Sequence, residues 1–133
     1  MIAAVADTHT AVWYLFNNPK LSAGARQAIE EAFLAGDQVG VSSISLAEMI
    51  YLAEKGRIPS TAVQDLIHGL FDPEYPLHEL PVDASVAEQM AFISRDEVPD
   101  MPDRIFAATG LRYEVPVISR DGKIRASRIQ TIW

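Results

Sequence analysis

Residues 2–17 read IAAVADTHTAVWYLFN, an apolar run that stops at a carboxylate and is followed, after a short polar stretch, by a second apolar segment. Within residues 10–17 the apolar side chains recur at helical spacing. The stretch therefore predicts a strand over residues 2–6, a polar turn that begins at Asp7, and a helix over residues 10–17. A strand that feeds directly into a helix is the opening unit of an α/β fold.

The same alternation of short apolar strands and amphipathic helices continues to the end of the chain. Further strands are predicted over residues 38–42, 77–82, 115–118 and 129–133. Helices are predicted over residues 22–35, 45–56, 60–71 and 83–93, and from Pro102 to Gly110, with a loop over residues 72–76. This order favours a three-layer α/β sandwich with a central parallel sheet, and no linker divides residues 1–133 into more than a single domain.

Composition narrows the class of protein further. The chain has 133 residues, of which 49% are hydrophobic and 22% charged, as in one globular domain. It has no cysteine, which excludes a disulfide framework, a thiolate metal site and a cysteine nucleophile. No apolar run approaches the roughly 20 residues that span a bilayer, and the N-terminus lacks the basic start of a secretory signal, so we expect a cytoplasmic protein with no membrane contact.

The charge balance is acidic, with 18 acids against 11 bases and a net charge of −7. This argues against binding nucleic acid through a broad basic face, because phosphate contacts need lysine and arginine. The bases are unevenly placed, however, and several crowd the C-terminal segment after an acidic stretch over residues 96–121. Arg104, Arg120, Lys123 and Arg125 could steer an RNA backbone, although such a run is also typical of a solvated face.

Carboxylates occur where open parallel sheets place their functional groups, at the carboxyl ends of strands. Asp7 ends the first predicted strand, Glu48 lies on the helix after the second, and Asp121 follows the strand over residues 115–118. Asp103 falls in the first turn of a predicted helix. We expect these four acids to cluster. Their mutual repulsion would be relieved by a hard divalent cation, Mg²⁺ or Mn²⁺.

A cluster of this kind can hydrolyse a phosphodiester with metal-activated water and needs no histidine. If the four proposed acidic ligands are left out of the count, the net charge changes from −7 to −3, and two bound divalent ions would bring the whole protein from −7 to about −3 as well; with both changes the remaining charge is about +1. An anionic backbone could then approach. Thr8, Ser43 and Ser119 are candidate hydrogen-bond partners that hold the carboxylates, although serine and threonine at such places often only cap helices.

Four motifs in order carry a resemblance that covers essentially the whole chain. They are AVADTHT (4–10), SSISLAEM (42–49), DMPDRIFAATG (100–110) and VISRDGKI (117–124). Together they resemble the PIN domain and, within it, the VapC-type ribonuclease toxins. The resemblance implies a metal-dependent endoribonuclease in which Asp7, Glu48, Asp103 and Asp121 occupy the family's acidic positions and Asp100 is an auxiliary acid.

The resemblance also implies partners. A toxin of this type would pair with a small antitoxin whose C-terminal segment covers the acidic pocket, often with an arginine, and would form a homodimer. The chain departs from the family pattern at one place that bears on substrate binding. Residues 97–100 read Glu-Val-Pro-Asp where the family often has a basic pair before the first aspartate.

Other interpretations remain open from the sequence alone. Taken singly, Asp7, Asp103 and Asp121 suit helix caps or turns as well as metal ligands. A non-catalytic binding module could keep the same fold and acids. A receiver-like phospho-acceptor domain is a weaker alternative, since the chain lacks adjacent acids after the first strand.

Overall fold

The computed structural model describes all residues 1–133 and contains one five-stranded sheet in which every pair of neighbouring strands is parallel. The strand order is β3-β2-β1-β4-β5. The strands are β1 (Ile2–Ala6), β2 (Gln38–Ser42), β3 (Leu77–Leu80), β4 (Val117–Ile118) and β5 (Thr131–Ile132). The predicted central parallel sheet is therefore confirmed.

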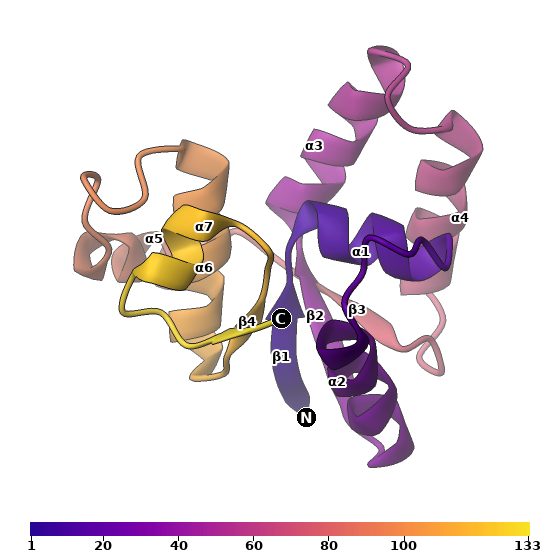
Figure 1. Cartoon of the computed structure of the whole chain (residues 1–133), viewed down its shortest axis with the longest axis horizontal. Helices are drawn as coiled ribbons and strands as arrows, with labels where there is room; N and C mark the ends of the chain where they lie inside the picture. Colours follow the sequence, from indigo (N-terminus) through magenta and orange to yellow (C-terminus); the bar gives the residue numbers. More distant parts are fainter.

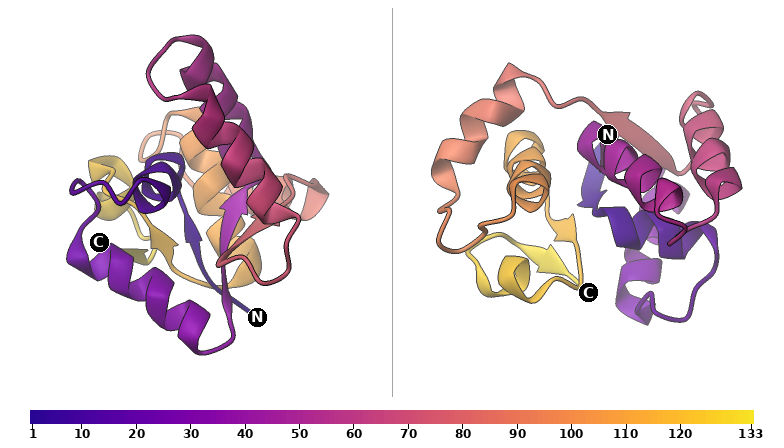
Figure 2. Two further views of the ribbon diagram at one scale, coloured as in Figure 1. Left: turned by 90° about the vertical axis from the view of Figure 1, so that its right-hand side faces the viewer. Right: turned by 90° about the horizontal axis from the view of Figure 1, so that it is seen from above.

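Helices cover both faces of this sheet, which makes the expected three layers (Figure 1). One side carries α1 (Thr8–Leu15), α2 (Ala23–Leu34), α3 (Ser43–Glu54) and α4 (Ser60–Leu70). The other carries α5 (Ala84–Gln89), the 3₁₀ turn η1 (Met90–Phe92), α6 (Met101–Tyr113) and α7 (Gly122–Ala126). Helices α3 and α4 form a pair that projects beyond the sheet (Figure 2). No helix is long and apolar enough to cross a membrane.

The central strand β1 contributes side chains to a separate hydrophobic core on each face of the sheet. Ala4 and Ala6 are buried in the core shared with α1–α4, whereas Val5 between them is buried in the core shared with α5–α7. Successive strand residues point to opposite faces, so an apolar run with no polar member is what a doubly covered strand requires.

The order of the strands creates a crevice beside β1. From β1 the chain adds β2 and β3 on one side, then returns to add β4 and β5 on the other. Open α/β sheets bind ligands where the strand order reverses in this way, outside the carboxyl ends of the strands. The backbone N–H of Asp7 donates to the carbonyl of Ile118 (3.1 Å), which sets the end of β1 against the end of β4.

The predicted end of one helix is wrong because of how that helix packs. The helix predicted to end at Gly110 continues to Tyr113 and is closed by Glu114, whose φ is +56°. Gly110 lies inside α6 because the helix passes close to β4: a Cβ at this position would lie 2.6 Å from Cγ1 of Val117. The glycine therefore permits a close approach and does not stop the helix.

The C-terminal region also differs from expectation. Asp121 and Gly122 do not form a simple turn but start α7, a short helix that the sequence did not predict. Strands β4 and β5 are two residues each, shorter than the predicted 115–118 and 129–133. Earlier in the chain α1 begins at Thr8, two residues before its predicted start, because Asp7 caps it. The 83–93 segment divides into α5 and η1.

Candidate active site

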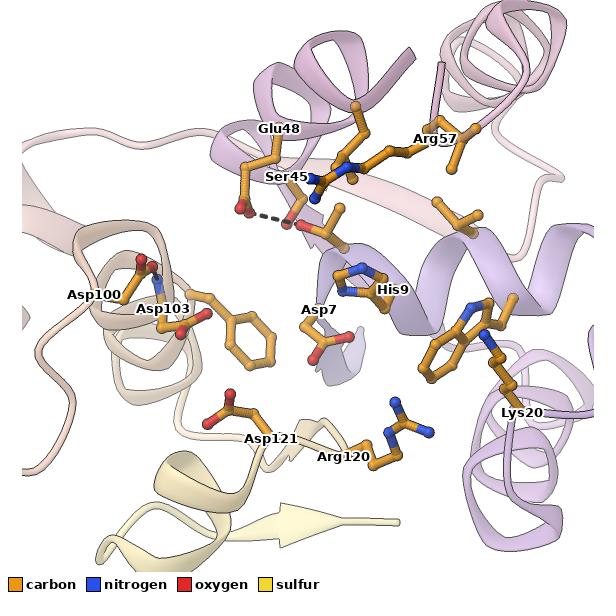
Figure 3. Close-up of a pocket in the computed structure, with 16 residues that line it drawn as sticks. Asp7, His9, Lys20, Ser45, Glu48, Arg57, Asp100, Asp103, Arg120 and Asp121 are labelled. Atoms are coloured by element: carbon orange, nitrogen blue, oxygen red, sulfur yellow. Dashed lines mark hydrogen bonds between the residues drawn. The ribbon is translucent and has the colours of Figure 1, made fainter. Parts of the chain in front are cut away.

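A pocket of about 650 Å³ opens at the carboxyl ends of the strands, at the predicted crevice. All four predicted acidic ligands and the auxiliary acid line it (Figure 3). They come from four separate segments of the chain, namely Asp7 after β1, Glu48 on α3, Asp100 and Asp103 at the start of α6, and Asp121 after β4. The structure thus brings together the five carboxylates that the sequence singled out.

Three of these carboxylates are also helix N-caps. One oxygen of Asp7 accepts a hydrogen bond from the α1 backbone (2.8 Å), one of Asp100 accepts from the α6 backbone (3.1 Å), and one of Asp121 accepts two from the α7 backbone (3.0 Å each). The capping and ligand interpretations are therefore compatible, because each cap uses one oxygen. The positive ends of the helix dipoles also offset part of the repulsion among the acids.

Two hydroxyl groups orient the carboxylates as expected. Thr8 Oγ1 donates to Oε1 of Glu48 (2.7 Å), and Ser119 Oγ donates to Oδ2 of Asp7 (2.6 Å). Ser119 Oγ also accepts from the backbone N–H of Asp121 (3.0 Å), so it links two of the acids. Both hydroxyl residues are buried, which fixes the rotamers of the acids they contact.

Ser43 does not have the expected role. Its Oγ accepts from the backbone N–H of Val82 (3.0 Å) and holds the segment after β3, not a carboxylate. Ser45 lines the pocket instead and is buried, three residues before Glu48 and so on the same face of α3. The helix was predicted to begin at Ser45, but α3 begins at Ser43, and the serine two residues further along is the one that shares the face of Glu48.

The pocket makes negative charge costly. Burial raises the pKa of Glu48, and this effect outweighs the hydrogen bond from Thr8, which lowers it. The pKa of Asp103 is raised to about 7, first by burial and then by the negative charge of the four other carboxylates in the pocket. Without a cation, the site therefore holds a proton near neutral pH.

The opposite side of the pocket is basic and aromatic (Figure 3). It is lined by Lys20, Arg57, Arg120, His9 and Trp13. None of these cations forms an ion pair with the acids: the only ion pair in the structure joins the N-terminal ammonium group to Asp37 at 3.7 Å. Acids and bases that share a pocket without pairing leave both charges available to a ligand.

Of the expected RNA-contacting bases, the structure places only Arg120 in the pocket. The prediction that Arg104 contacts RNA is wrong. Its guanidinium group donates to the carbonyl oxygens of Met90 and Ile93 (2.9 and 3.0 Å) and so connects η1 to α6. Lys123 and Arg125 are exposed on α7 and do not line the pocket.

On the basic side of the pocket, sequence reasoning missed every lining residue except Arg120. For His9 and Trp13 a signal was present, since a helix that starts at Thr8 puts positions four apart on one face, next to the capping Asp7. Lys20 and Arg57 lie in the connections after α1 and α3 and carry no periodic signal.

The donor set fits a hard divalent cation. Every candidate ligand is a carboxylate oxygen, and the five carboxylates lack a basic partner. No three acidic or histidine side chains are arranged so that they could hold one ion by themselves. Mg²⁺ suits such a site, because it keeps several waters and takes one or two carboxylates together with oxygens of the substrate.

Comparison with known proteins agrees with this geometry. The chain is 27% identical to Ribonuclease VapC22 of Mycobacterium tuberculosis over 136 residues, with all of both chains covered. Among solved structures it resembles VapBC2 from Rickettsia felis bound to a promoter DNA fragment (17% identity, TM-score 0.71, 98% and 97% of the chains covered). It also resembles FitAcB from Neisseria gonorrhoeae (23% identity, TM-score 0.62, 98% and 96% covered).

The family itself is settled by a match along nearly the whole sequence. The pattern that describes the PIN domain fits residues 4–129, a range that runs from within β1 to beyond α7 and includes all five carboxylates of the pocket. The receiver-like alternative is thereby set aside. On fold, site geometry and sequence together, the chain belongs to the PIN domain family.

Proposed function

We propose that this PIN domain is a metal-dependent endoribonuclease and the toxin of a toxin–antitoxin pair. The observation that carries the proposal is the divided pocket: five carboxylates lie on one side, three cationic side chains lie on the other, and no ion pair joins them. A phosphodiester substrate with a divalent cation satisfies both sides at once. The relative named Ribonuclease VapC22 supports the choice of RNA.

In this proposal Asp7, Glu48, Asp103 and Asp121 hold Mg²⁺ or Mn²⁺, and Asp100 assists them. When bound, such an ion supplies charge neutralisation at the phosphate and a nucleophile at neutral pH. The chain's own residues position the reactants. Thr8 and Ser119 fix the carboxylates, and Arg120, Lys20 and Arg57 attract the RNA backbone to the opposite side of the pocket.

The direct test is cleavage of a mixture of structured RNAs by the full chain with Mg²⁺, with Mn²⁺ and with EDTA. We expect cutting that requires the metal and is lost in Asp103→Asn, whose side chain has nearly the same shape. Asp96→Asn is the matched control, since it removes one exposed carboxylate outside the pocket. If the folded wild type cuts no RNA with either metal, the chain is a non-catalytic binding module.

The proposed partner is a cognate antitoxin. The chain also resembles in fold a chain of a toxin–antitoxin complex from Klebsiella pneumoniae, at 22% identity and a TM-score of 0.69, with 98% of this chain and 97% of that chain covered. An antitoxin segment that carries an arginine would find five unpaired carboxylates in the pocket. We expect the antitoxin to abolish RNA cleavage at a one-to-one ratio, and light scattering of the toxin alone to report a homodimer. Cleavage that persists with saturating antitoxin would contradict the first expectation.

A further inference from the structure

The basic side of the pocket contains a stacked pair of side chains that the hydrolysis itself does not require. The guanidinium carbon of Arg120 lies 4.8 Å from the centre of the Trp13 ring. This pair joins the segment after β4 to α1, and so it borders the crevice next to Asp7. Figure 3 shows the guanidinium group of Arg120 directed into the pocket and not toward Asp121.

The indole of Trp13 is held in place from two sides. His9, one helical turn earlier, lies 5.5 Å away ring to ring, and the Trp133 ring meets Trp13 edge-on at 6.0 Å. Trp13 is also partly buried against the core formed with α1–α4. The ring therefore loses little conformational freedom when a ligand binds, and it provides a fixed surface against which Arg120 packs.

Arg120 is exposed and has no carboxylate partner, although Asp121 is its neighbour in the chain. A guanidinium group is planar, and in this exposed side chain the surface turned away from the indole is open to a ligand. Planar cations of this kind stack on unpaired bases of single-stranded nucleic acid. A lysine would supply the charge without the plane.

We infer that Arg120 stacked on Trp13 is a platform for an unpaired nucleobase next to the phosphodiester held in the acidic pocket. Lys20 and Arg57, which line the same pocket, contact the flanking phosphates through charge alone. The inference rests on the proposed function, because it assumes an RNA substrate, and it adds a requirement that the RNA be single-stranded at the site. It also accounts for binding by an acidic protein: a few placed cations and one stacking surface replace a broad basic face.

The test compares two probes with the same phosphates. One is a fluorescein-labelled oligouridylate, and the other is the same sugar-phosphate chain without bases. Both are titrated with the full chain carrying Asp103→Asn, so that cleavage does not interfere, and fluorescence anisotropy gives each Kd. We expect the probe with bases to bind about 10- to 100-fold more tightly, because stacking of one or two bases contributes about this factor.

The variants separate stacking from charge. Arg120→Lys should reduce the preference for bases to less than about 3-fold and leave binding of the abasic probe unchanged, since the charge is kept. Arg125→Lys is the matched control, since this exposed arginine lies outside the pocket, and it should keep the full preference. Trp13→Leu should lose the preference and Trp13→Phe should restore part of it, with circular dichroism used to check that each variant is folded. A preference that survives in Arg120→Lys, or its absence in the parent protein, would overturn the inference.

The outcomes also distinguish this inference from the proposed function. If the wild type cleaves RNA but the two probes bind equally, the platform is refuted and the nuclease stands. If the probes differ in a way that depends on Arg120 but no RNA is cleaved with any metal, the nuclease is refuted and the base-binding platform stands.

Discussion

Replacing Asp103 with asparagine should stabilise the metal-free protein while it removes activity. The pKa of Asp103 is raised to about 7 from an ordinary 3.8 by burial and by the other carboxylates in the pocket. Three pKa units correspond to at most about 4 kcal/mol, and because the side chain is only half-buried we discount this to about 2 kcal/mol. An uncharged amide of the same shape avoids this penalty but cannot ligate a cation as a carboxylate does.

The penalty depends on pH in a predictable direction. The pKa of Asp103 is higher in the folded state, so the folded protein binds more protons between about pH 4 and pH 7 than the unfolded chain does. The metal-free wild type is therefore expected to lose stability relative to Asp103→Asn as the pH rises through this window. Near pH 4 and below, the carboxyl is protonated in both states and the difference should vanish.

Urea unfolding in EDTA at pH 8, 6 and 4 measures the difference directly. Asp103→Asn should exceed the wild type by about 2 kcal/mol at pH 8, and Asp96→Asn, an exposed control, should change stability by less than about 0.5 kcal/mol. Adding millimolar Mg²⁺ at pH 8 should stabilise the wild type more than the variant. If Asp103→Asn is no more stable than the wild type at pH 8, the carboxylate is not an uncompensated charge and the argument for a cation site fails.

Three further predictions follow from hydrogen bonds at and near the site. Ser119→Ala removes the donor to Asp7 and should weaken Mg²⁺ binding, followed by thermal shift, about 10- to 100-fold. Arg104→Met leaves both carbonyl oxygens without their shared guanidinium donor and should lower the free energy of unfolding by about 1–3 kcal/mol with KM for RNA unchanged; a raised KM alone would reinstate Arg104 as an RNA contact. Asp121→Ala should cost about 1 kcal/mol more stability than Asp121→Asn, which can still cap α7, whereas both should lose cleavage.

Much of the fold was predictable from local patterns. The apolar run of β1 and the cap at Asp7 are local features. So are the helix starts predicted at residues 22 and 83, where the side chains of Ser22 and Asp83 cap α2 and α5. The errors arose where tertiary packing decides. Gly110 is a usual stop signal, but the approach of β4 gives it a different use. Helix α7 has five residues, too few for a periodic pattern to reveal it.

The two sides of the pocket differ in how far the sequence could predict them. Four of the acids follow strands or begin helices, and Glu48 lies on the helix that directly follows β2, so the parallel topology alone directs them to one edge of the sheet. The positions of the cationic side chains depend on the paths of the connections between helices, where Lys20 and Arg57 lie. Arg57 follows Gly56, whose φ of +73° closes α3 and turns the chain back, and nothing in the residues around Lys20 or Arg57 shows that both side chains reach the same cavity.

The caps explain how the chain keeps so many acids in one pocket without unfolding. An ordinary cluster of five carboxylates would be strongly destabilising, but Asp7, Asp100 and Asp121 each gain backbone hydrogen bonds that a helix terminus must otherwise leave to water. Those bonds stabilise the fold even when no cation is bound. The unfavourable charge is therefore concentrated on Asp103, whose pKa is raised most clearly and which caps nothing. It follows that the acids divide by role: alanine at a cap should lower stability and activity together, whereas Asp103→Asn should remove activity while it raises the stability of the metal-free protein.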